Sequence, residues 1–137
     1  MSPENESTQG PGARLPEGLR QGGWQLIETL DAAGRGPDAA FWLWFPDVED
    51  WRLMFAGGPL FEGGAKAAHR RLRETVQQLG RPGGLQLKHL GVAKEDARSV
   101  ALIREAVYTG PGIHGIRIRD NVIGGRRIRR AYVYRVM

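Results

Sequence analysis

Arginines alternate with isoleucines near the C-terminal end of the sequence, in Ile116-Arg117-Ile118-Arg119. A period of two is typical of a β-strand with one buried and one exposed face. Residues 128–136 predict a second strand, so that the two strands would form a hairpin. The outward face of this hairpin is expected to carry a band formed by Arg117, Arg119, Arg129 and Arg135, extended at the tip by Arg126 and Arg127.

Clustered guanidinium groups suit phosphate recognition, because each offers two parallel donors and keeps its charge at every relevant pH. We therefore expect the six arginines of this band to contact a polyanion, above all DNA or RNA. The same period places Tyr132 and Tyr134 on the opposite, core-facing side of the last strand. Two alternatives stay open for the band: a solvated sheet face, or a docking surface for an acidic protein. The acidic partner could be the chain's own Asp47–Asp50 turn in a homo-oligomer.

A second candidate surface is aromatic. Residues 39–45 predict a strand in which Phe41, Leu43 and Phe45 share one face and Trp42 and Trp44 share the other. Exposed aromatic side chains mark interfaces. If no helix covers them, Trp42 and Trp44 predict a protein-interaction module or a homodimer.

Residues that could support catalysis or bind small ions are few and scattered. Gly63 and Gly64 precede a predicted helix with Lys66 in its first turn, a weak anion site that lacks the residues of a nucleotide-hydrolysing loop. The three histidines have no second ligand at metal spacing, and the chain has no cysteine. We expect no metal and no cofactor. An enzyme using His114 or the Asp47–Asp50 turn is the least favoured function.

Charge is distributed unevenly along the 137 residues. Residues 1–62 have a net charge of −6 and residues 63–137 a net charge of +11, for a total of +5. A basic half suggests an anionic partner. Arginine, glycine and alanine also rise together with GC-rich coding, so that the position of the arginines is a better guide than their number. No apolar run has the length of a membrane span, and no signal peptide is evident, which predicts a cytoplasmic protein without a membrane partner.

The order of predicted elements is α-β-β-α-β-α-β-β. It indicates an α+β fold with a single, mostly antiparallel five-stranded sheet and about three helices on one face. Residues 1–14 are polar and are expected to be a disordered tail, and residues 15–137 a single domain. Gly22 and Gly23 weaken the first predicted helix, which spans residues 16–33 and is firmest from Trp24 onward.

Three stretches carry a family resemblance: the aromatic run at 40–53, the glycine-rich run at 108–117 and the closing block at 131–136. Together they resemble a family of small, uncharacterised bacterial cytoplasmic proteins. The resemblance covers residues 24–137. It implies a bacterial cytoplasmic origin and a single domain, and it supplies no activity, cofactor or catalytic residue.

Overall fold

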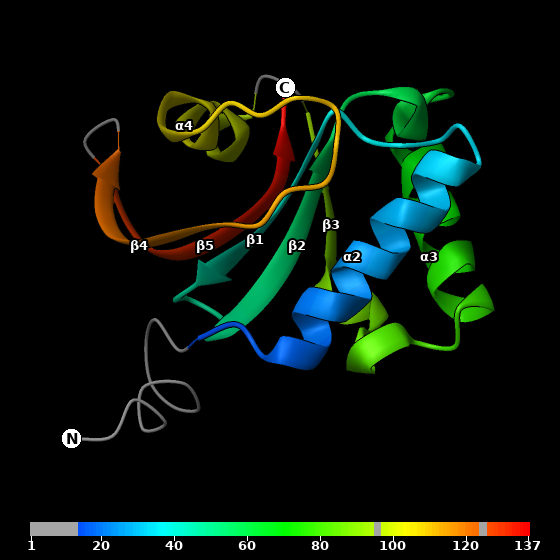
Figure 1. Cartoon of the computed structure of the whole chain (residues 1–137), viewed down its shortest axis with the longest axis horizontal. Coiled ribbons are helices and arrows are strands. Elements are labelled where there is room, and N and C mark those ends of the chain that lie inside the picture. Colours follow the sequence, from blue (N-terminus) through cyan, green and yellow to red (C-terminus); the bar gives the residue numbers. More distant parts are fainter. Residues whose placement is uncertain (1–13, 95–96, 124–125) are drawn as a thin grey trace.

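Three α-helices and five strands form the parts of the chain that the computed structural model describes, which are residues 14–94, 97–123 and 126–137. The helices are α2 (Glu17–Ala32), α3 (Ala65–Gln78) and α4 (Arg98–Ala106). The strands are β1 (Ala39–Phe45), β2 (Asp50–Ala56), β3 (Leu90–Ala93), β4 (Ile116–Ile123) and β5 (Arg126–Val136). Figure 1 shows that β4 and β5 form a long, curved hairpin.

The five strands form one sheet in the order β3-β2-β1-β5-β4. The pairs β1–β2, β1–β5 and β4–β5 are antiparallel, whereas β2 and β3 are parallel. Helix α3 lies in the connection between the two parallel strands, as a parallel pair requires a crossover. The predicted α+β class and the five-stranded sheet are confirmed, and the sheet is mixed.

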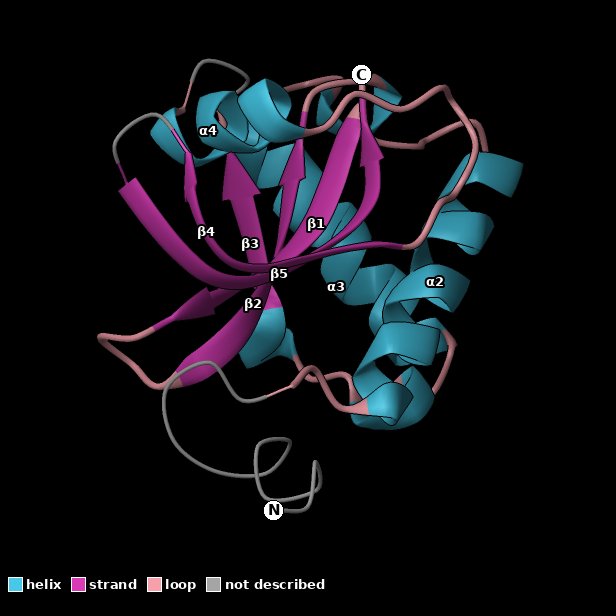
Figure 2. Ribbon diagram, turned by 60° about the vertical axis from the view of Figure 1, so that its left-hand side comes forward, coloured by secondary structure: helices cyan, strands magenta, loops and turns pink. Residues whose placement is uncertain are grey.

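Helices cover both faces of this sheet, and the prediction that they lie on one face is wrong (Figure 2). Trp42 packs in a core with residues of α2 and α3, such as Leu26 and Leu72. Its neighbour Phe41 packs in a second core with Val100 and Ile103 of α4. Because β1 is apolar on both faces and central in the sheet, each face needs its own cover.

Helix α2 starts earlier than its two glycines suggest. A Cβ atom at Gly22 would lie 2.1 Å from the carbonyl oxygen of Pro82, and one at Gly23 would lie 2.4 Å from the Tyr134 hydroxyl oxygen. The glycines are therefore sites of close approach, where α2 packs against the Pro82–Gly84 turn and against β5. This packing offsets their low helix propensity.

A short 3₁₀ turn (Leu87–His89) precedes β3. The predicted tail at residues 1–14 lies outside the described residues, except for Arg14. None of the helices in the described ranges has the length and the apolar character needed to cross a bilayer.

Candidate nucleic-acid interface

The register between β4 and β5 decides which arginines share a face. Arg117 is paired with Tyr132, and Arg119 is paired with Arg130. Directly opposed residues of an antiparallel pair project to the same side of the sheet. Arg117 and Arg119 therefore share a face with Tyr132, and the prediction that the tyrosine lies opposite them is wrong.

Four arginines line one pocket on this face, and we call it the arginine pocket. They come from three segments: Arg14 precedes α2, Arg117 and Arg119 lie on β4, and Arg130 lies on β5. Arg14, Arg117 and Arg119 are exposed, and Arg130 is half-buried. The remaining lining residues are Leu15, Trp51, Ile118, Ala131 and Tyr132.

Aromatic rings form part of the wall of the arginine pocket. The guanidinium carbon of Arg117 lies 5.2 Å from the centre of the Tyr132 ring, within range of a cation–π interaction. Trp51 is only 4% exposed, and its indole N–H has no acceptor among the described residues. Both rings are too buried to stack with a ligand directly, but the Tyr132 ring holds the Arg117 guanidinium group at the surface.

An acidic side chain of the described residues acts on this region. Glu17, in the first turn of α2, forms an ion pair with Arg20. The hydrogen bond from Arg20 is the main cause that lowers the pKa of Glu17, and the charge of Arg117 adds to the effect. The bonds of Arg20 to Glu17 and to the Tyr132 hydroxyl in turn raise the pKa of Arg20. Glu17 is therefore already engaged by Arg20, which lies outside the pocket lining.

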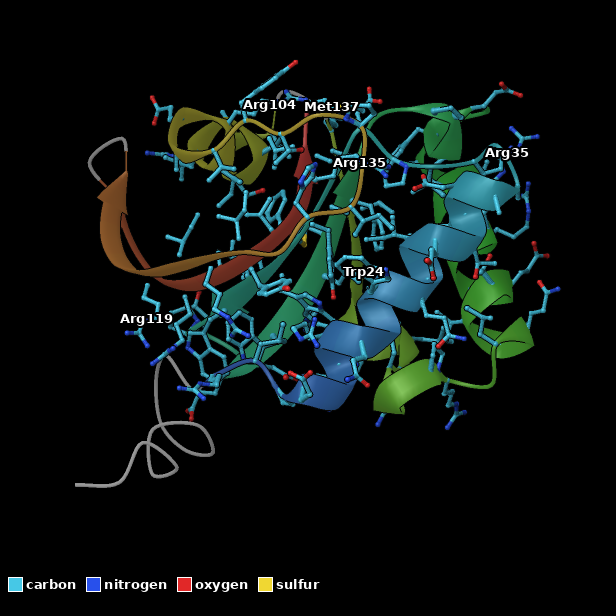
Figure 3. All side chains as sticks on the ribbon, viewed as in Figure 1. Trp24, Arg35, Arg104, Arg119, Arg135 and Met137 are labelled. Atoms are coloured by element: carbon cyan, nitrogen blue, oxygen red, sulfur yellow. The ribbon has the colours of Figure 1, made fainter. Side chains whose placement is uncertain are left out.

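Arg135 does not belong to an outward band, and its predicted phosphate contact is wrong. It is 3% exposed and donates to both carboxylate oxygens of Asp31, at 3.1 and 2.6 Å. It also donates to the carbonyl oxygens of Pro37 at 2.9 Å and Gly112 at 3.1 Å. Figure 3 shows Arg135 between the end of β5 and α2, far from Arg119 on the outer strand.

A β-bulge turns Arg135 toward α2, where its contacts with Asp31 and with the loop at Gly112 bury it. The register between β1 and β5 shifts between Ala40 and Phe41, so that Arg135 is paired with Ala40 while Val133 is paired with Phe41. A bulge inserts an extra residue and breaks the period of two. Val133 thus faces the core at α4, whereas Arg135 turns toward α2. The side chains of Arg126, Arg127 and Arg129 lie outside the described residues.

The tryptophan face is not an open surface. Trp42 is fully buried, and its indole N–H donates to the Tyr134 hydroxyl at 2.9 Å. Trp44 is half-buried and packs edge-on against Trp51, with 5.8 Å between the ring centres. The condition for the predicted interface, that no helix covers these residues, is not met at Trp42, because α2 and α3 pack over it.

The weaker sequence candidates lie apart from the arginine pocket. Gly63, Gly64 and Lys66 are exposed at the start of α3, and none of them lines the pocket. The amide of His114 donates to the carbonyl of Tyr134 at 2.7 Å, beside the start of β1, whereas the Asp47–Asp50 turn follows the end of β1. Among the described residues, no group of three or more histidine, aspartate or glutamate side chains could hold a metal ion.

Comparison with family models, with curated proteins and with solved structures gives no match. The chemistry of the surface is therefore the guide to function. The arginine pocket on that surface includes Arg14. The periodicity of the sequence does not indicate this residue. No local signal could have found it, because its place beside β4 depends on how the chain enters α2.

Proposed function

We propose that this protein binds nucleic acid through arginine–phosphate contacts at the arginine pocket and performs no catalysis there. The observation that carries the proposal is the convergence of Arg14, Arg117, Arg119 and Arg130 on one pocket. Side chains that carry the same charge repel one another, so that a cluster of this kind gains free energy when an anion binds. Phosphate oxygens match the donor geometry of a guanidinium group.

The aromatic wall favours nucleic acid over other polyanions. Arg117 lies over the Tyr132 ring on one side and is exposed on the other. A guanidinium group in this position can stack with an unpaired base, as arginine planes do in RNA recognition. Single strands therefore suit this surface better than duplexes. Contacts of this kind depend on salt and read little of the base sequence.

The proposal is tested by reversing two charges in the pocket. We expect the double variant Arg117→Glu and Arg119→Glu to bind a single-stranded oligonucleotide roughly 100-fold more weakly, since each charge-assisted contact contributes about 1.5 kcal/mol or more. The slope of log K against log salt should fall by roughly 1.4, because each phosphate contact in a single strand contributes about 0.7. Fluorescence anisotropy across a salt series measures both quantities.

The matched control places the same charge reversal elsewhere. Arg70 and Arg73 are exposed on α3 and do not line the pocket. The double variant Arg70→Glu and Arg73→Glu changes the net charge equally, and we expect it to retain most of the affinity. Equal losses in the two double variants would show that only net charge matters, and they would refute the proposed site.

An acidic protein partner is the competing candidate, including a second copy of this chain that offers its acidic turn. Asp47 and Glu49 are exposed, so that they are accessible to such a contact. Light scattering coupled to size exclusion distinguishes the two. A dimer that dissociates in the Arg117→Glu and Arg119→Glu variant would assign the arginines to self-association.

A further inference from the structure

The size of the arginine pocket restricts what can enter it. The pocket encloses about 20 Å³, which is room for one or two water-sized groups. The ring of a nucleobase does not fit in this space. One or two oxygens of a phosphate group have the required size, and they would meet charged side chains from three segments of the chain.

Among the described residues that line the pocket, none has a carboxylate. Glu17, which acts on Arg117 from α2, is bound by Arg20. The exposed side chains of Arg14, Arg117 and Arg119 therefore bring more positive charge to the pocket than a phosphodiester with one negative charge needs. A phosphate monoester carries about −1.5 to −2 charges near neutral pH and has three free oxygens, and it matches this surplus better.

The wall of the pocket includes a buried aromatic side chain. Trp51 lines the pocket, is 4% exposed, and has an indole N–H that no acceptor among the described residues satisfies. Arg14, Trp51 and Arg119 come from separate parts of the sequence, so that the pocket is a feature of the folded chain.

We infer that the arginine pocket binds a terminal phosphate monoester, as found at the phosphorylated end of a nucleic-acid strand. This inference rests on the proposed function and names the part of the ligand that the pocket holds. The rest of the strand would follow the outward face of β4, where Arg117 and Arg119 are exposed. A free mononucleotide offers the same monoester, and the experiment separates the two sources.

The experiment compares two single-stranded DNAs of equal charge. One has about 12 nucleotides and a 5′-phosphate, and the other is two nucleotides longer with a 5′-hydroxyl, because a monoester adds about −2 charges. We expect the phosphorylated strand to bind about fivefold or more tightly by competition anisotropy. A strand with a 3′-phosphate shows whether one end is preferred. Competition by AMP against adenosine, at constant ionic strength, shows whether the monoester alone is sufficient.

The Arg14→Gln variant tests the assignment to the pocket. We expect it to lose the preference for the phosphorylated strand while it still binds both strands through β4. The matched control is Arg73→Gln on α3, which should retain the preference. Circular dichroism confirms that both variants are folded.

The outcomes separate the inference from the proposed function. Equal binding of the two strands, with binding still dependent on Arg117 and Arg119, would overturn the inference and leave the proposed function intact. A preference that persists in Arg14→Gln would also overturn the inference. Absence of binding to every strand would overturn both.

Discussion

At the scale of single residues, Arg135 connects β5 with two segments that are distant from it in the sequence. Its guanidinium group binds Asp31 of α2, the carbonyl of Pro37 before β1, and the carbonyl of Gly112 in the loop after α4. Five donors on one rigid group make this possible, and lysine could not reproduce the geometry. Arg135 is therefore part of the scaffold that positions β5.

Removing this side chain should destabilise the fold. We expect Arg135→Met to lower the free energy of unfolding by about 2–4 kcal/mol, somewhat less than the loss of a fully buried ion pair, because the Asp31 side chain is 35% exposed. Urea unfolding followed by tryptophan fluorescence measures the change. Arg119→Met, at an exposed position, is the matched control and should change stability by no more than about 0.5 kcal/mol. Similar stabilities for the two variants would contradict this role.

His89 makes stability depend on pH. Burial lowers its pKa, and the carboxylate of Asp50 opposes the effect in part. The Nδ1 atom of His89 accepts a hydrogen bond from the Gln86 amide at 3.0 Å, and protonation of that atom would remove the bond. The imidazole also packs edge-on against Trp42, with 5.9 Å between the ring centres. The folded state therefore favours neutral His89.

The direction in which stability changes with pH follows from the linkage between folding and proton binding at His89. Because the pKa of His89 is lower in the folded state, the unfolded chain binds the proton more readily. The stability due to neutral His89 is complete above the unfolded pKa of about 6.5 and decreases as the pH falls below it. We expect the unfolding midpoint to fall on acidification, and to fall less in His89→Gln. His114→Gln, at an exposed position, should keep the wild-type slope. Identical slopes in all three proteins would exclude His89 as the cause.

At the scale of elements, the contact between α2 and β5 is built around Tyr134. Its hydroxyl donates to the carbonyl of Arg20 in α2 and accepts from the Trp42 indole of β1. Burial is the main cause that raises the pKa of Tyr134. The ring also meets Trp24 edge-on, at 6.4 Å between centres. Gly23 leaves the space that lets this hydroxyl reach the helix backbone.

Filling that space should separate the two elements. We expect Gly23→Ala to destabilise the protein by about 1–3 kcal/mol, despite the better helix propensity of alanine, since its Cβ would lie 2.4 Å from the Tyr134 oxygen. Urea unfolding measures the loss. Gln21→Ala, at an exposed position of the same helix, should be nearly neutral. The cost of Gly23→Ala should shrink in a Tyr134→Phe background, and an unchanged cost would argue against this clash.

At the scale of the whole molecule, the sequence predicts the helices and strands better than it predicts how the strands pair and which faces are covered. Alternation in residues 116–119 correctly placed Ile118 in the core and Arg117 and Arg119 outside it. Alternation within one strand does not determine which residues of the next strand share a face, because a shift of one residue in pairing exchanges the two faces. The bulge opposite Ala40 and Phe41 added a second shift. The pairing of Arg117 with Tyr132 places Tyr132 on the side opposite to the predicted one, whereas Arg135 is absent from the exposed band because it is buried against Asp31 of α2.

The candidate site was predictable only in part. Arg117 and Arg119 could be found from their spacing, whereas Arg14 and Trp51 are brought to them by the folded chain. The prediction of an open surface at Trp42 is wrong for a related reason. A strand that is apolar on both faces can be exposed or covered, and only the packing of α2 and α3 decides between the two.

The position of β1 in the sheet has a consequence for biosynthesis. β1 is the central strand, and one of its two neighbours is β5, which follows it by about ninety residues. Contacts between such distant segments slow folding, because a long loop must close before they form. A nascent chain emerging from the ribosome can form the β1–β2 hairpin early, but one edge of β1 must wait until β5 has been translated. During that interval the free edge could pair with other chains, and it is the place where a chaperone would be most useful.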